Sequence, residues 1–101
     1  MNEEQREKEI QEKGLTAPRL TPESIKAKVK SIHFHRFEGT TTTVCCIKLE
    51  NDFTAIGHSA CASPENFDAK MGEKIALDDA MNRVWELEGY LLKEKLYTKQ
   101  K

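Results

Sequence analysis

The chain has 101 residues, of which 38% are hydrophobic and 33% are charged, and its formal net charge is −1. This length fits one domain with a small core, and the sequence holds no run of about 18 apolar residues that would predict a membrane span. The near-zero net charge disfavours a general nucleic-acid binder, because such proteins carry a basic surplus. The low apolar fraction indicates a solvated segment or a core that is shared with a second chain.

The chain order begins with a polar segment. Residues 1–20 predict a flexible charged tail whose first half has the composition of a charged helix without an apolar stripe. Residues 21–101 are expected to form a single α+β domain. Thr21 is a suitable N-cap and Pro22 suits the first helical position. We therefore expect a short helix that ends near Lys30.

Three strands are expected next. Residues 31–37, 41–50 and 53–62 are rich in β-branched and aromatic side chains, or alternate between apolar and polar. The Asn51-Asp52 pair between the last two segments is a hairpin signal. Gly57 inside the third segment indicates a bulge or the close approach of another backbone. Short strands joined by tight turns predict a three-stranded antiparallel meander.

A long helix is expected to follow. Ser63-Pro64 combines an N-cap with a proline at the first helical position, so the helix is expected over residues 64–96, with a possible end or kink at Gly89. Its apolar stripe contains Phe67, Met71, Ile75, Ala80, Val84, Leu87 and Leu91. A helix of about 50 Å is too long for strands of about 20 Å to cover. We therefore predict a homo-oligomer, a dimer or larger, that forms through the long helix.

The sequence contains little that could support catalysis or metal binding. Cys45, Cys46 and Cys61 follow a polar N-terminus without an apolar leader, which predicts reduced thiols and a cytoplasmic protein. His33 and His35 would share one face of a strand, yet the usual zinc spacings are absent. No nucleophile, base and orienting group occur together. We expect no enzyme activity, no catalytic residue, no metal and no cofactor.

Arginine and asparagine offer better candidates for ligand binding. Arg36 and Arg83 fall inside the expected fold, and guanidinium groups suit phosphates and aromatic rings. The alternative is a surface ion pair, for instance between Arg83 and Asp79. Asn66 is expected at the first turn of the long helix, where free N–H groups favour anions, although simple local capping is the alternative. Asn66 and Arg83 would meet only across an antiparallel pair of helices from two copies.

The sequence also resembles a known family, the gene-49/gene-66 family of small bacteriophage early proteins. The residues that carry the resemblance are Glu38-Gly-Thr-Thr-Thr-Thr-Val-Cys, the strand from Phe53, Ser59-Ala-Cys-Ala-Ser-Pro-Glu-Asn-Phe-Asp, Lys74-Ile-Ala and Trp85-Glu-Leu-Glu-Gly-Tyr-Leu-Leu. The resemblance covers about residues 22–97. It implies a phage or prophage source and action in the cytoplasm of an infected bacterium.

The chain is similar, more weakly, to phage anti-Thoeris proteins. That similarity implies an oligomer that binds a cyclic ADP-ribose-type immune signal and sequesters it without cleavage. Arg36, Phe53, Asn66 and Arg83 match the chemistry that such a ligand requires: cations for phosphate, an aromatic ring for adenine and a polar amide. The first functional hypothesis is therefore a counter-defence protein that sequesters a nucleotide signal. The alternative is an adaptor or inhibitor that uses its charged tail and apolar helix to bind a host protein.

Overall fold

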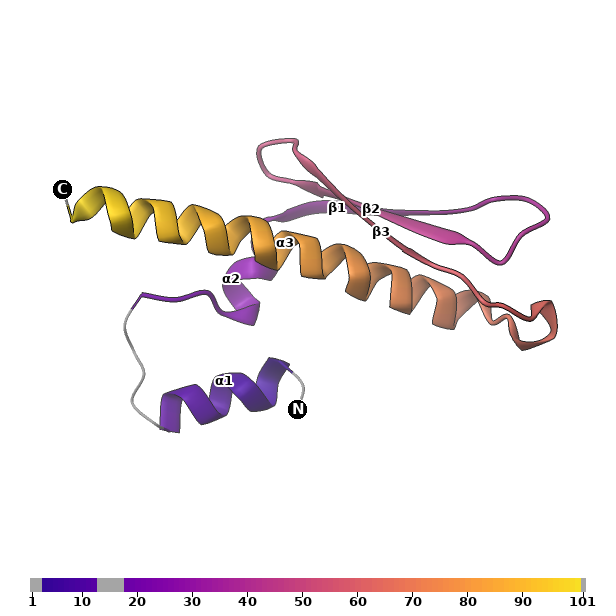
Figure 1. Cartoon of the computed structure of the whole chain (residues 1–101), viewed down its shortest axis with the longest axis horizontal. Helices are drawn as coiled ribbons and strands as arrows, with labels where there is room; N and C mark the ends of the chain where they lie inside the picture. The colour runs from indigo at the N-terminus through magenta and orange to yellow at the C-terminus, as the bar shows by residue number, and fades with distance from the viewer. Residues whose placement is uncertain (1–2, 13–17, 101) are drawn as a thin grey trace.

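The structure is a computed structural model, and it describes residues 3–12 and 18–100 (Figure 1). Its elements are α1 (Glu3–Glu12), α2 (Pro22–Lys26), β1 (Val29–Arg36), β2 (Thr43–Leu49), β3 (Thr54–Ser59), the 3-10 turn η1 (Pro64–Asn66) and α3 (Ala69–Lys99). The expected α+β class is confirmed, with three strands followed by one long helix. No helix in the described ranges is long and apolar enough to cross a membrane.

The three strands form the expected antiparallel meander, in the order β1-β2-β3. Its register places Phe34 opposite Cys45 and Cys45 opposite Gly57. The β2–β3 hairpin turns at Asp52, which has a φ of 70°, and the Asn51 side chain accepts a hydrogen bond from the N–H of Phe53 at 3.0 Å. The hairpin signal in the sequence is therefore confirmed.

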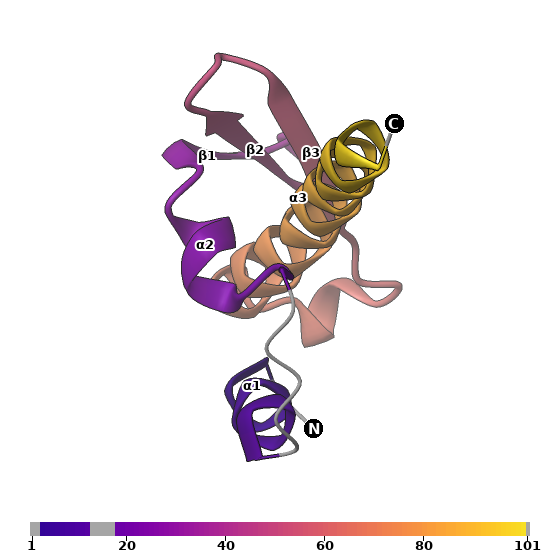
Figure 2. The ribbon, with the colours of Figure 1, turned by 90° about the vertical axis from the view of Figure 1, so that its left-hand side faces the viewer.

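The core lies between one face of the sheet and α3 (Figure 2). In the central strand β2, every second side chain from Thr43 to Leu49 is buried, and the side chains between them are partly exposed. The buried apolar residues are Ile25, Cys45, Ile47, Leu49, Ala55, Ala76, Ala80 and Val84. Alternation along the strand and four-residue steps along the helix thus place one apolar face of each element against the other.

The contact between sheet and helix is closest at Gly57. A Cβ atom at this position would lie 2.2 Å from the backbone N of Ala80 and 2.4 Å from the backbone O of Ala76. Only a residue without a side chain fits here, and the two alanines on α3 provide the matching small surface. The expected close approach of another backbone is therefore confirmed.

The expected start of the long helix at Ser63-Pro64 is wrong. Residues 64–66 form a single 3-10 turn, and Phe67 then adopts an extended conformation with φ −70° and ψ 130°. The helix α3 begins at Ala69, where the Asp68 side chain accepts a hydrogen bond from the N–H of Met71 at 3.1 Å. The hydroxyl of Ser63 donates to the Glu65 carboxylate instead of capping a backbone group.

Two further helix boundaries differ from expectation. The short helix α2 ends at Lys26 rather than near Lys30, because the chain joins the sheet early: the carbonyl of Lys28 accepts a hydrogen bond from the N–H of Glu50 at 3.0 Å. The alternative end at Gly89 does not occur, because α3 continues through it to Lys99, three residues past the expected end at residue 96. The helix therefore extends past the sheet (Figure 1).

The N-terminal segment contains the expected charged helix. It is α1, whose sequence EEQREKEIQE has no apolar stripe, and it lies farther from the sheet than α2 (Figure 2). The flexibility of residues 1–20 stays a prediction, and residues 1–2 and 13–17 lie outside the described part of the chain.

Candidate functional site

Two of the four residues that were expected from the sequence to bind a ligand line a hollow between the outer edge of β3 and α3. Its volume is about 350 Å³. The residues that line it are Phe53, Thr54, Ala55, Ile56, Arg83, Glu86, Leu87 and Tyr90. Phe53 comes from the β2–β3 hairpin and Arg83 from the middle of α3, so an aromatic ring and a guanidinium group lie at one depression.

The side chains of this hollow are accessible to a ligand. Phe53 is 56% exposed and Tyr90 is 72% exposed. The Arg83 side chain is 53% exposed, and its Nη1 lies 3.9 Å from Oε1 of Glu86. An ion pair this long and this exposed contributes little to stability, so the guanidinium remains able to turn towards an anionic group. Two rings and one exposed cation suit a planar, phosphate-bearing molecule.

Local structure explains why these residues meet. Phe53 follows the left-handed Asp52 at the hairpin turn, which directs the chain back towards α3. Arg83 and Tyr90 are seven positions apart on α3, a spacing that puts both on the same side of a helix. Sequence reasoning did not nominate Tyr90, although this seven-residue step from Arg83 was a signal that could have identified it.

Arg36 and Asn66 lie elsewhere. The Arg36 guanidinium carbon is 5.2 Å from the centroid of the Phe67 ring, and Nη1 donates to the carbonyl of Thr40 at 3.3 Å. Asn66 is exposed on η1, directly before Phe67, and not in the first turn of the long helix as expected. The structure therefore places these two candidates near one another, at the end of the molecule where α3 begins.

One chain does not bring the two groups of candidates together. Arg83 is 14 residues beyond Ala69, the first residue of α3, which corresponds to about 21 Å along the helix. A single small ligand cannot span that distance. A site that combined Asn66 with Arg83 would require two copies of the chain, so the composite site stays a prediction.

The alternative for Arg83, a surface ion pair, is present in the structure, with Glu86 and not Asp79 as the partner. Asp79 instead faces β3: its Oδ2 accepts a hydrogen bond from the backbone N–H of His58 at 3.0 Å and lies 3.8 Å from Nδ1 of the same residue. The hydrogen bond from His58 to Asp79 thus links the outer edge of β3 to α3.

The Cys45 thiol is a poor candidate for a nucleophile. All three cysteines are free, and burial of Cys45, together with the neighbouring Cys46, raises the pKa of the Cys45 thiol. A thiol with a raised pKa is a poor nucleophile. Within the described ranges, no three side chains of His, Cys, Asp or Glu are close enough to hold a metal ion.

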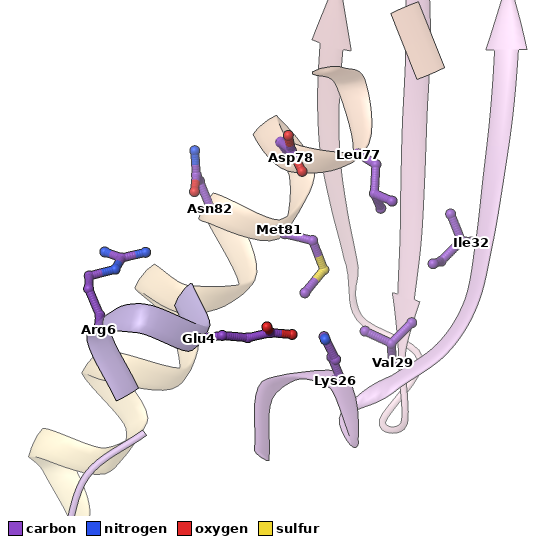
Figure 3. A pocket seen from close by; sticks show the side chains of 9 residues that line it. All are labelled: Glu4, Arg6, Lys26, Val29, Ile32, Leu77, Asp78, Met81 and Asn82. Atoms are coloured by element: carbon purple, nitrogen blue, oxygen red, sulfur yellow. The ribbon is translucent and has the colours of Figure 1, made fainter. Parts of the chain in front are cut away.

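A larger hollow of about 790 Å³ lies between β1 and α3 (Figure 3). Its apolar floor is formed by Val29, Ile32, Leu77 and Met81. Its polar rim is formed by Glu4, Arg6, Lys26, Asp78 and Asn82. None of the four residues that were expected to bind a ligand lines this hollow. Charges of both signs at the rim and an apolar floor are more typical of a protein contact than of a site for an anionic small molecule.

Comparison with known proteins assigns the chain to a family. A sequence profile of the phage protein (N4 Gp49/phage Sf6 gene 66) family matches residues 20–96, which is most of the chain. Searches of curated proteins and of solved structures found no match. The chain belongs to the phage N4 Gp49/phage Sf6 gene 66 family, and the resemblance to the gene-49/gene-66 family is confirmed. The similarity to anti-Thoeris proteins stays a prediction.

Proposed function

We propose that this member of the phage N4 Gp49/phage Sf6 gene 66 family is a counter-defence protein that binds and sequesters a nucleotide-derived immune signal. The ligand class is a cyclic ADP-ribose-type or cyclic-nucleotide molecule, and the protein retains it without cleavage. The observation that carries this proposal is the hollow in which Phe53, Tyr90 and Arg83 lie together.

The chemistry of the hollow matches the two parts of such a ligand. A purine ring stacks on an aromatic side chain, for which Phe53 and Tyr90 are available. A phosphate accepts paired hydrogen bonds from a guanidinium group, for which Arg83 is available. Glu86 beside Arg83 favours a ligand whose ribose hydroxyls can donate hydrogen bonds to its carboxylate over a bare polyphosphate.

Retention without cleavage fits the groups that surround the hollow. The lining contains no cysteine or histidine, and its one carboxylate, Glu86, lies 3.9 Å from the Arg83 guanidinium without the second carboxyl group that cleavage of a glycosidic bond requires. A protein that acts by sequestration must be present in an amount comparable to that of its ligand, and a small chain suits that demand.

The test is a thermal-shift screen against cyclic ADP-ribose, its cyclic isomers and cyclic di- and trinucleotides. A ligand that binds only the native state stabilises it by mass action, by about 2.7 kcal/mol at a concentration 100 times Kd. We expect one of these molecules to raise Tm by several degrees. After heat denaturation, mass spectrometry should recover the ligand intact.

The Arg83→Ala variant should abolish the shift while leaving the far-ultraviolet circular dichroism spectrum unchanged, since the arginine side chain is about half exposed. The Lys95→Ala variant is the matched control. It removes one positive charge from an exposed position of the same helix, at a different shallow hollow, and should keep the shift. If no nucleotide changes Tm, or if a ligand is recovered as a hydrolysed product, the proposal is wrong.

The alternative function, an adaptor or inhibitor of a host protein, is supported by a different observation. The C-terminal half of α3 exposes large apolar side chains: Leu87, Tyr90, Leu91 and Tyr97 are between 40% and 72% exposed. Such a surface is typical of protein contacts. A host protein that is captured with the full chain and released by Leu91→Glu, in the absence of any nucleotide shift, would favour this function.

A further inference from the structure

The two edges of the sheet differ in how they are covered. β3 runs beside α3, and its outward-facing His58 N–H is bonded to the Asp79 carboxylate at 3.0 Å. At the opposite edge, β1 pairs with β2 on one side, and no other strand of the described chain lies along its second side. An uncovered strand presents a row of backbone donors and acceptors that another chain can use.

The hydrogen bonding of the β1–β2 pair shows which backbone groups point outward. Phe37, directly after β1, donates its N–H to the carbonyl of Thr42 at 3.3 Å, on the β2 side. Backbone groups of successive residues point alternately to the two edges of a strand, and the register is unbroken beyond the irregularity near the start of β1. The N–H and C=O groups of Ile32, Phe34 and Arg36 therefore face the free edge.

The side chains at this edge are apolar on the face that carries the core. Ile32 is opposite Ile47 and Phe34 is opposite Cys45, both of which are buried against α3. However, Ile32 and Phe34 are themselves 43% and 39% exposed, because α3 covers β2 and β3 but not β1. The hollow between β1 and α3 continues this apolar surface (Figure 3). A fourth strand at the free edge would cover it.

The charge carried by β1 and the residues directly before it has one sign, while Glu4 and Asp78 lie at the rim of the neighbouring hollow. The segment 26–36 reads KAKVKSIHFHR and contains no acidic residue. Oδ1 of Asp52, in the hairpin turn, lies 3.0 Å from Nζ of Lys30 and 3.5 Å from Nζ of Lys48. One carboxylate thus faces two ammonium groups, and a positive surplus remains. Pairing β1 with β1 of a second copy would bring like charges together, which is destabilising.

We propose that the free edge of β1 is a docking site for an extended, acidic segment of a partner protein, which joins the sheet as a fourth strand. Backbone hydrogen bonds to Ile32, Phe34 and Arg36 would supply affinity, and alternate apolar side chains of the segment would pack on the exposed face of Ile32 and Phe34. Acidic side chains between these apolar ones would be attracted to the basic residues of segment 26–36, so an acidic segment would bind more tightly than a neutral one. This site is separate from the hollow at Phe53 and Arg83.

The test uses the full chain and a synthetic peptide of alternating Glu and Val with the length of β1. Amide hydrogen exchange, followed by NMR, reports each edge group separately. We expect the amides of Ile32, Phe34 and Arg36 to exchange fast in the free protein and at least tenfold more slowly with saturating peptide. The amides of His33 and His35 already face β2 and should change little.

A pair of variants separates the backbone contribution from the side chain. Phe34→Pro removes one outward N–H, and proline is tolerated where that group faces solvent at an edge. Phe34→Ala removes the ring alone. We expect Phe34→Pro to bind the peptide about tenfold more weakly than Phe34→Ala, the effect of losing one hydrogen bond and leaving its partner unpaired. If Phe34→Pro does not fold, the exchange experiment on the unaltered chain decides.

Three results would overturn the proposal. The first is equal binding of a control peptide in which Lys replaces every Glu. The second is protection that appears along β3 or α3 and not at the outward amides of β1. The third is protection of the same amides by a single-stranded oligouridine at the same concentration, which would assign the basic edge to nucleic acid.

Discussion

Two glycines of the chain stand in opposite environments, and they allow a direct test of how α3 packs on the sheet. Gly57 faces the backbone of Ala76 and Ala80 so closely that no Cβ fits between them. Gly89 lies inside α3 with open surroundings, where an added Cβ would meet only the Leu20 side chain, at 3.9 Å. The same chemical change, one added methyl group, should therefore have opposite effects at the two positions.

We predict that Gly57→Ala lowers the free energy of unfolding by about 3 kcal/mol or more, because backbone atoms of α3 must move away from β3. Gly89→Ala should raise it by about 1 kcal/mol, since alanine is the better helix former in a helix interior. Urea denaturation of both variants measures the difference. Equal effects of the two substitutions would show that α3 does not pack on the sheet at Gly57.

At the scale of elements, the start of α3 shows which features of a helix boundary can be predicted from the sequence and which cannot. Two acceptable caps lie five residues apart, at Ser63 and Asp68, and a proline follows the first. Local rules favour the first, but the extended backbone at Phe67 ends that turn, and the Phe67 ring lies under Arg36 of a distant strand. Such a tertiary contact is not encoded in the local pattern.

Asp68→Ala should therefore lower the free energy of unfolding by about 1 kcal/mol, the usual cost of losing a helix N-cap. Ser63→Ala should have little effect on stability, because its hydroxyl bonds the exposed Glu65 carboxylate and no backbone group of α3. That hydrogen bond lowers the pKa of Glu65, so Ser63→Ala should raise this pKa towards its ordinary value. Chemical denaturation and NMR titration measure the two effects. A larger loss for Ser63→Ala than for Asp68→Ala would contradict the assigned helix start.

The strands and the candidate hollow were predictable to different extents. Alternating and β-branched patterns identified the meander, because each strand carries its own signal. The sequence indicates Arg83 and Phe53 as candidates only by their chemistry. The packing of the hairpin against α3 shows that these two residues share a hollow and that Arg36 and Asn66 lie outside it. Tyr90 is not part of the apolar stripe of α3, so only its seven-residue spacing from Arg83 indicates that the two side chains lie on the same side of the helix.

At the scale of the whole molecule, α3 is longer than the sheet that covers it. The helix face that meets the sheet contains Ala76, Ala80 and Val84, each 0% exposed. The same face continues at steps of three and four residues through Leu87 and Leu91, which are 40% and 41% exposed. One continuous apolar stripe is thus buried along its first half and open along its second, over a molecule whose longest extent is 53 Å.

We predict that a second copy covers this open half, with the two α3 helices antiparallel. In an isologous dimer each leucine occurs twice, and a buried leucine contributes about 1.5–3 kcal/mol. Leu91→Glu should therefore weaken the dimer at least tenfold without changing the fold, because the side chain is exposed in the single chain. Lys93→Glu, on another side of the same helix turn, should leave the dimer intact. Sedimentation velocity at tens of micromolar measures both, and a wild-type chain that sediments as a monomer would contradict the dimer.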